Sequence, residues 1–422
     1  MIRSFIPIAF ALTLAACGGS DDAAPKAALD TAQPAHWNTI ATQAVANDAA
    51  LAPPGLPPMV ESRIYAMAFS AAHDALNAID RRYMPYLTDT SVPGADADAA
   101  VATAMHDVLK AQLPSQATYL DDRYTEALAL VAAGTAKTAG ITLGQQTAQA
   151  MLTARASDGS ANAQQPYVPG ANPGAYQVTP PINFAAFVGW GQVKPYVLTS
   201  GAQFRAPPPY SVLDLAYTED YVEMKALGGM NSTMRSADQS EIAKFWLENT
   251  PASWARIAGQ VAATRKLNGW DQARLFTLVE LAEADAYISA LETKYFYNFW
   301  RPITAIRAGD SDGNPDTVGD ASWTPFDPVT PPVPDYVSAH ASAAGAGAAV
   351  MQAVLGDAAT FSYTSTSLPG ATRNYTSFSQ VAAEIGVSRI YVGYHFRRAV
   401  DEGLTQGKAV GGYVMSHALP AR

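Results

Sequence analysis

The sequence predicts an all-α protein, and three observations lead to that prediction. Apolar residues recur at spacings of three and four along most of the chain, which is the spacing of one helix face. Helix-forming residues, alanine above all, dominate the composition. Long alternating runs of Val, Ile and Thr, typical of a sheet core, are scarce. With 422 residues, 49% of them hydrophobic, the chain can bury a large core as one large domain or two fused ones.

The N-terminus, residues 1–17, has the pattern of a lipoprotein signal peptide. Its apolar stretch, 5–14, is too short to span a bilayer. The sequence LAAC that follows resembles a bacterial lipobox, in which the cysteine, here Cys17, is lipidated. The alternative is an ordinary cleaved signal with an incidental cysteine. We expect an exported periplasmic or cell-surface lipoprotein on a flexible tether, 18–35, in the outer membrane if the bacterium is Gram-negative, because Gly18 follows the cysteine.

Two antiparallel helical bundles are expected, an N-terminal one at about 36–157 and a second at about 213–422. Between them, 158–212 is rich in Pro, Gly, Asn, Tyr and Gln, and we expect a long loop that shapes a pocket mouth. A second loop, 308–337, contains DSDGNPD, which resembles part of a calcium loop but lacks its terminal Glu. The expected helices are 36–51, 61–80, 95–112, 115–133, 136–157, 237–249, 251–266, 269–299, 340–356, 378–392 and 399–416.

The formal net charge of -10 disfavours a nucleic-acid partner, because phosphate backbones attract basic surfaces. A few desolvated cations in a pocket can still hold an anion against that overall charge. Beyond the signal peptide, no stretch is apolar enough and long enough to cross a membrane, so any membrane association comes through the lipid anchor.

A first candidate segment, KYFYNFWRP, contains Lys294 and Arg301, seven residues apart. If the helix continues until Pro302 ends it, the two cations lie two turns apart on one helix face. Burying two cations in an aromatic-rich stretch is costly unless an anion lies between them. The alternative interpretation is a solvated basic face.

Two further segments contain histidines. PDYVSAH places Ser338 and His340 at the start of a helix, where a hydroxyl and backbone N–H groups favour an anion; the alternative is a Ser cap beside a structural His. SRIYVGYHF contains Arg389 and His395, which would point apart on a continuous helix. Gly393 allows the helix to end, so that His395 turns back toward Arg389; the alternative is a core histidine.

Together these side chains match the needs of a tetrahedral oxyanion, phosphate or vanadate. Cations neutralise its oxygens, one histidine ligates or attacks along its axis, and the other transfers a proton. The three segments resemble the signatures Lys-x6-Arg-Pro, Pro-Ser-Gly-His and Ser-Arg-x5-His of the vanadium-dependent haloperoxidase and type 2 phosphatidic acid phosphatase (PAP2) superfamily. Segments 63–86 and 297–307 resemble its bacterial haloperoxidase-like branch. The resemblance implies two packed helical bundles with long Pro/Gly-rich loops.

The resemblance also assigns roles. Lys294 would polarise the bound anion, His340 would be the acid–base group, and His395 would be the axial ligand to the vanadium of vanadate, or the nucleophile that becomes phosphohistidine in a phosphatase. The residues implied to bind vanadate, or phosphate in the same site, are Lys294, Arg301, Ser338, Ala339 through its N–H, His340, Arg389 and His395.

Some positions depart from the family pattern. Ala339 replaces the usual Gly and narrows the approach, and Val337 replaces the usual Pro. Leu291 and Val333 stand where characterised haloperoxidases have aromatic or histidine side chains near the halide, which puts halide handling in doubt. Other candidates are Asp74 and Asp285 as partners of an active-site Arg or His, and His73 as a pocket residue, whereas His36, His106 and His417 are expected to be surface or structural.

Three functions are compatible with these features. The first is a vanadate-dependent peroxidase that oxidises a halide or small organic substrate with hydrogen peroxide at vanadate held on His395. The second is a periplasmic acid phosphatase that acts on a phosphomonoester through a phosphohistidine at His395. The third is a non-catalytic anion-binding lipoprotein, which the intact set of cations and histidines disfavours.

Overall fold

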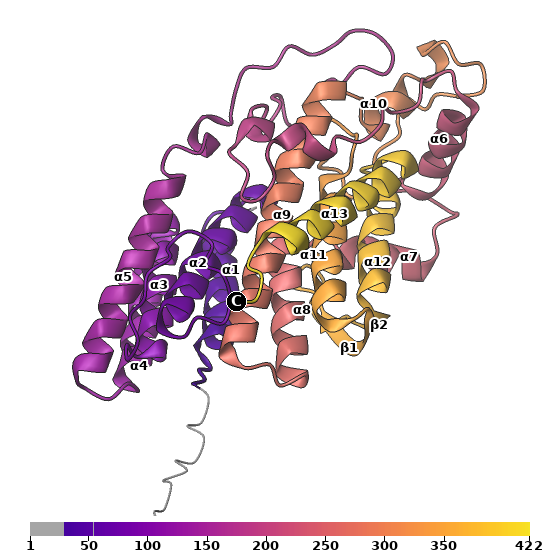
Figure 1. Cartoon of the computed structure of the whole chain (residues 1–422). Coiled ribbons are helices and arrows are strands. Elements are labelled where there is room, and N and C mark those ends of the chain that lie inside the picture. The colour runs from indigo at the N-terminus through magenta and orange to yellow at the C-terminus, as the bar shows by residue number, and fades with distance from the viewer. Residues whose placement is uncertain (1–28, 54) are drawn as a thin grey trace, which may run out of the picture.

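The computed structural model describes residues 29–53 and 55–422. Within them the protein is all-α, as predicted: 13 α-helices are joined by long loops and accompanied by one two-stranded sheet. Figure 1 shows α1–α5 on one side and α8, α11, α12 and α13 on the other, with the long helix α9 between them. The signal peptide, Cys17 and the tether up to residue 28 lie outside the described residues.

The first bundle follows the expected periodicity closely. Its α1 begins three residues before the expected helix start at residue 36, because Pro34 lies in its first turn, a position that needs no N–H donor. The helices are α1 (Gln33–Leu51), α2 (Pro58–Ile79), α3 (Ala97–Gln112), α4 (Ala117–Ala129) and α5 (Thr135–Arg155).

The second bundle contains two features that we did not predict from the sequence. Helix α6 buries Tyr217, Tyr221 and Met224, whose helical spacing we overlooked. A hairpin pairs β1 (Ala358–Thr364) with β2 (Thr372–Ser377), and its alternating run is too short to stand out. The helices are α6 (Leu215–Leu227), α7 (Ala237–Phe245), α8 (Thr250–Thr264), α9 (Gly269–Tyr297), α10 (Pro302–Arg307), α11 (Ala339–Leu355), α12 (Phe378–Tyr391) and α13 (Arg397–His417).

Helix α9 joins the two bundles. It contacts α2 of the first bundle and α11 and α13 of the second, and it is buried on nearly all sides, as expected for a helix between two layers. The main apolar core runs from α1–α5 through α9 into α11–α13, so the bundles share one core. The site described below lies where the C-terminal end of α9 meets α11 and α12.

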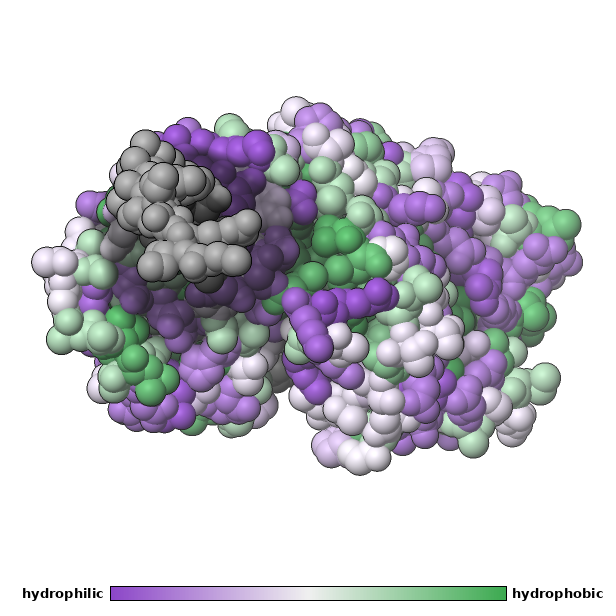
Figure 2. Space-filling model, turned by 60° about the horizontal axis from the view of Figure 1, so that its bottom comes forward, coloured by the Kyte–Doolittle hydropathy of each residue, from purple (hydrophilic) through white to green (hydrophobic). Residues whose placement is uncertain are grey.

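The segment 158–212 contains no α-helix and only the short 3₁₀ helices η2 (Ser160–Asn162), η3 (Trp190–Gln192) and η4 (Gly201–Phe204). Both η3 and η4 contact α9, so the segment lies along the bundle as predicted. Hydrophilic residues cover most of the face in Figure 2, and apolar ones gather in small patches. In the described part of the chain, no helix has the length and apolar character needed to cross a membrane.

Candidate anion-binding site

The end of α9 differs from our prediction. The helix stops at Tyr297, because Asn298 adopts a left-handed conformation with φ of 52°, which Asn tolerates better than most residues. Pro302 does not end α9 but starts α10, where Arg301 is the N-cap residue. Lys294 and Arg301 therefore do not share a helix face, and the expected two-turn geometry is wrong.

The two cations are nevertheless brought together by the segment 331–335. Lys294 Nζ donates to the carbonyl oxygens of Pro334 at 2.6 Å and Asp335 at 2.9 Å. Arg301 Nε donates to Val333 O at 2.7 Å, and its Nη2 to Pro331 O at 3.2 Å. Both side chains are 1% exposed, so carbonyl dipoles supply the solvation that water provides at a surface.

His395 lies in the turn after α12, and this part of the prediction is confirmed. Gly393 takes a φ of 89°, and the N–H groups of Tyr394 and His395 both donate to Arg389 O, at 3.0 and 3.2 Å. The buried imidazole contacts two side chains. Its Nδ1 is 2.8 Å from Asp335 Oδ1, and its Nε2 is 3.1 Å from Arg301 Nη1.

Ser338, Ala339 and His340 begin α11, as predicted. Ser338 is the N-cap and accepts from Ala341 N–H at 3.3 Å, which leaves its own hydroxyl hydrogen free to donate. The N–H groups of Ala339 and His340 belong to the first turn, where a helix provides no internal partner. His340 is partly exposed as a residue, but its Nε2 is inaccessible and has no hydrogen-bond partner among the described residues.

Arg389 supplies the third cation from α12. Its Nη1 donates to Trp246 O at 3.1 Å, and its guanidinium lies 4.9 Å from the centre of the Tyr394 ring. The buried Nε has no partner within the described part of the chain. Arg389 therefore retains donor capacity for a further acceptor.

The electrostatics of the site favour an anion. None of Lys294, Arg301 and Arg389 forms an ion pair with a carboxylate among residues 29–53 and 55–422. Burial, together with the neighbouring Arg301, holds the pKa of Lys294 well below its usual value, and burial lowers the pKa of Arg389 to about 10. An anion between these groups would offset both effects.

Both histidines are held in the neutral form. Burial, and then the charge of Arg301, lowers the pKa of His395 well below its usual value. Burial and the charge of Arg389 do the same to His340. Neutral imidazoles keep a lone pair, which a ligand to a metal oxyanion or a proton acceptor requires.

Asp335 is a site residue that the sequence analysis missed. It is 1% exposed, and burial raises its carboxyl pKa to about 7 although Arg301 and Lys294 oppose the shift. The signal that could have revealed it is an acidic residue three positions before Ser338, inside the second segment. Nothing in the sequence indicated that it would contact His395.

An apolar wall borders the site at the two positions that depart from the family pattern. Leu291 and Val333 pack in one buried cluster with Tyr287 and Trp190. Trp190 comes from η3 in the 158–212 segment and makes an edge contact with Phe187, with ring centroids 5.7 Å apart. Aromatic side chains therefore do flank this side of the site, and the loop supplies two of them.

Three other candidates serve the fold and not the site. Asp285 accepts the N–H groups of Tyr196, Val197 and Leu198, so its predicted pairing with an active-site Arg or His is wrong. Asp74 binds the N–H groups of residues 86–88 in the same way. In both cases a carboxylate on a buried helix binds the backbone N–H groups of a neighbouring loop and so anchors that loop.

The remaining histidines and the calcium-like loop also have structural contacts. His73 is buried against Met84 O at 3.1 Å and does not reach the site. His106 lies between two aspartates, 2.7 Å from Asp107 and 2.9 Å from Asp121. In DSDGNPD, Asp312 accepts from Thr317 and from a backbone N–H of its own turn. Among the described residues no group of acidic, His or Cys side chains converges to hold a metal ion.

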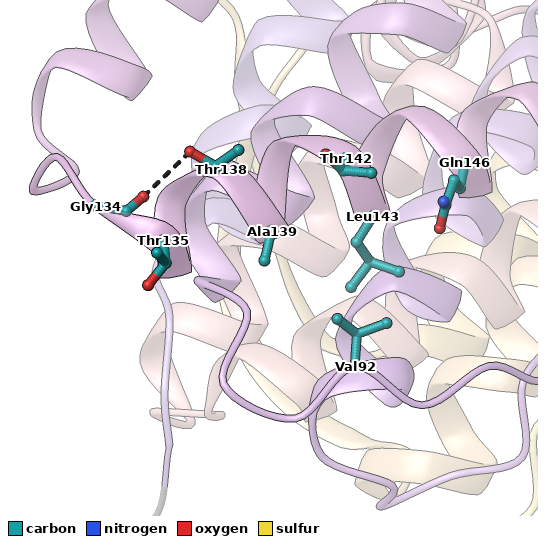
Figure 3. Close-up of a pocket in the computed structure, with 8 residues that line it drawn as sticks. All are labelled: Val92, Gly134, Thr135, Thr138, Ala139, Thr142, Leu143 and Gln146. Carbon is teal, nitrogen blue, oxygen red and sulfur yellow. Dashed lines mark hydrogen bonds between the residues drawn. The ribbon is translucent and has the colours of Figure 1, made fainter.

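A separate hollow lies away from this site. Figure 3 shows it at the start of α5, where Thr138 donates to Gly134 O at 3.2 Å. Its volume is about 700 Å³, and no ionisable side chain lines it. It therefore lacks groups for acid–base or anion chemistry, which the region around His395 contains.

The chain is similar to several known proteins. Residues 274–421 match the family described as the VCPO second helical-bundle domain. The vanadium chloroperoxidase of Curvularia inaequalis is 31% identical over 189 residues, a match that covers 37% of this chain and 30% of that protein. A bacterial vanadium-dependent iodoperoxidase superposes with a TM-score of 0.78 at 26% identity, covering 91% of this chain and 96% of the other. A holo-type bacterial vanadium-dependent chloroperoxidase gives 0.70 at 18%, covering 86% and 92%.

These matches support the superfamily of vanadium-dependent haloperoxidases and type 2 phosphatidic acid phosphatases, and the proteins that this chain resembles are haloperoxidases. The chain spans about a third of the length of the curated chloroperoxidase that it matches, and nearly the whole length of the iodoperoxidase.

Proposed function

We propose that this protein is a vanadate-dependent peroxidase that oxidises a halide or a small organic substrate with hydrogen peroxide. The observation that carries the proposal is the convergence of three buried cations, none paired with a carboxylate among the described residues, on two neutral histidines. Such a set suits a bound oxyanion with one axial ligand. Bound vanadate would supply the activation of hydrogen peroxide.

In this proposal the chain's own groups divide the work. Lys294, Arg301 and Arg389 hold the oxyanion oxygens, and the Ser338 hydroxyl and the Ala339 N–H donate to them. His395 would hold the vanadium of vanadate through the lone pair of Nε2. A similar donor set holds phosphate, so the residues also fit the simpler oxyanion.

His340 is the proposed acid–base group. His340 is partly exposed as a residue, whereas His395 is buried, so we assign proton transfer with an entering substrate to His340. Its neutral ring, with Nε2 free of protein partners in the described structure, can accept a proton and return it. The aromatic wall of Trp190 and Phe187 favours a polarisable or apolar substrate beside this histidine.

Export and lipid anchoring remain part of the proposal. The signal sequence with Cys17 supports a periplasmic or cell-surface location, where hydrogen peroxide and halides reach the protein from outside. The acid phosphatase alternative has less support, because the relatives of this chain are haloperoxidases.

A paired assay on the mature protein tests the function. One arm combines vanadate, hydrogen peroxide and bromide or iodide and follows halogenation of a dye. The other follows hydrolysis of a chromogenic phosphomonoester with and without vanadate. We expect vanadate-dependent halogenation; phosphatase turnover that vanadate inhibits, without halogenation, would overturn the proposal.

A further inference from the structure

The three sequence segments of the site meet at one residue, Asp335. Its N–H donates to Phe299 O at 2.9 Å, just after α9. Its carbonyl oxygen accepts from Lys294 Nζ at 2.9 Å, and its carboxylate contacts His395 at 2.8 Å. Two hydrogen bonds, to Phe299 and from Lys294, therefore fix the backbone of Asp335, and its carboxylate points toward the imidazole of His395.

The two neighbours of His395 select the same tautomer. A guanidinium has only N–H donors, so the ring nitrogen facing Arg301, Nε2 at 3.1 Å, must carry a lone pair. A carboxylate accepts, so the nitrogen facing Asp335, Nδ1, must carry the hydrogen. The separation of Arg301 Nη1 from Nδ1 is longer, 3.4 Å, which agrees with this assignment.

The Asp335 carboxylate has no side-chain partner other than His395 among the described residues. Oδ2 is buried without a partner among the described residues, and Asp335 lines a small cavity of about 10 Å³ together with Tyr217 and Asp220. No other side chain within the described structure makes a hydrogen bond to the carboxylate, so the bond to His395 is the one that orients both groups.

We infer that Asp335 is a positioning residue, which holds His395 as the Nδ1–H tautomer and so keeps the lone pair on Nε2, the nitrogen that faces Arg301. The inference rests on the proposed function, because an axial ligand needs that lone pair. It concerns the ring orientation and the place of the hydrogen, and it assigns Asp335 no contact with the substrate. Partners of this kind change metal affinity by roughly 10- to 100-fold when removed.

The first measurement is made on the mature protein without any added anion. Nitrogen NMR shifts of the histidine rings, assigned to His395 with the His395→Ala variant, report which ring nitrogen bears hydrogen. We expect Nδ1–H in the wild type and a weaker preference for it in Asp335→Ala, in which only Arg301 still selects this tautomer. A wild-type His395 with hydrogen on Nε2 would overturn the inference whatever the enzymatic activity.

The second measurement is binding of inorganic vanadate and of inorganic phosphate by calorimetry. We expect both to bind roughly 10- to 100-fold more weakly to Asp335→Ala. Asp335→Asn, whose amide oxygen can still accept from Nδ1, should recover a large part of the loss. Unchanged affinity in Asp335→Ala, or an Asn variant as weak as Ala in a folded protein, would contradict a positioning role.

Asp220→Asn is the matched control. Asp220 lines the same cavity and its charge acts on Asp335, but it accepts from Arg398 N–H and does not touch His395. Asp220→Asn should keep both the His395 tautomer and the vanadate affinity of the wild type. If it weakens vanadate binding as much as Asp335→Ala does, the loss comes from removing a nearby negative charge and not from the contact with His395, which would contradict the inference. The two ideas can fail separately. If Asp335→Ala changes the His395 tautomer in the absence of vanadate, but neither the wild type nor any variant has peroxidase activity, the proposed function is rejected and the inference stands.

Discussion

The guanidinium of Arg301 contacts the imidazole of His395, with 3.1 Å between Nη1 and Nε2, although Arg301 precedes α10 and His395 lies in the turn between α12 and α13. The same Nη1 donates to Tyr394 O at 2.8 Å. The planar guanidinium of Arg301 thus binds the backbone carbonyls of segment 331–333, the backbone just before His395, and the His395 ring nitrogen Nε2. Only a forked group with several donors can make all these bonds together.

Arg301→Lys should therefore weaken the site while preserving its charge. A single ammonium cannot bond Val333 O, Tyr394 O and His395 at once, so we expect vanadate affinity to fall by about tenfold or more. Calorimetry measures the affinity. Arg307→Lys on the exposed end of α10 is the control and should bind like the wild type; equal binding by both variants would contradict the role given to Arg301.

The two histidines should respond differently to substitution. His395→Ala should abolish activity and leave the fold intact, because the proposed axial bond is lost. His340→Ala should lower kcat by roughly 10²- to 10⁴-fold and change vanadate affinity much less, because only proton transfer is removed. Steady-state kinetics and calorimetry separate the two effects. Full activity in the His395 variant would be fatal to the mechanism.

A group of buried acids should make stability depend on pH. Glu61 is 1% exposed and lies near Glu280 and Glu283; burial raises the pKa of Glu61 from 4.5 to about 7. Because the pKa of Glu61 is higher in the folded state, its ionisation does not destabilise the fold below pH 4.5. As the pH rises through 7, ionisation of the buried carboxyl lowers the free energy of unfolding by about 3 kcal/mol in all. Glu61→Gln should therefore stabilise the protein at pH 8 and have little effect at pH 4.

Urea unfolding of the variant and the wild type at both pH values measures this difference. The Gln carbonyl can still accept from Asn249, whose amide lies 2.8 Å from Glu61. Glu126→Gln, on the exposed part of α4, controls for the loss of a charge and should change little at either pH. A Glu61 variant that is less stable than the wild type at pH 8 would refute the argument.

Asp285 should control the loop beside the site. Its carboxylate accepts three backbone N–H groups, from Tyr196, Val197 and Leu198, at 2.7, 2.7 and 2.9 Å. Asp285→Ala should cost about 3 kcal/mol or more, because buried donors lose their acceptor. Hydrogen exchange should accelerate around 190–204, the part that contributes Trp190 to the apolar wall.

Asp74→Ala provides a matched comparison, since it removes an equivalent carboxylate from α2. Its effect on exchange should centre on residues 86–88 and leave the 190–204 loop protected. If both variants accelerate the same amides, the loops are not anchored independently.

Lipid anchoring can be tested without reference to the fold. Expressed from the full chain in a Gram-negative host, the wild type should incorporate labelled palmitate and fractionate with membranes. Cys17→Ser should lose the label and leave the membrane fraction. Labelling that persists in the variant would show that Cys17 is not the anchor.

Several features followed from the sequence because they depend on local spacing. Helical periodicity identified most of the helices, and Gly393 correctly indicated the turn that brings the His395 backbone back to Arg389. Ser338 could be recognised as a helix cap because capping involves residues three apart. The anion-binding residue types and their order also required no knowledge of the fold.

Tertiary structure decided what depends on groups far apart in the chain. The left-handed Asn298 separated Lys294 and Arg301 onto different elements, and the carbonyls of 331–335 then reunited them. Asp335 met His395 only because three helix ends converge. A buried carboxylate must find donors wherever packing provides them, so the sequence could not distinguish Asp335, which reached the site, from Asp285, which anchors a loop.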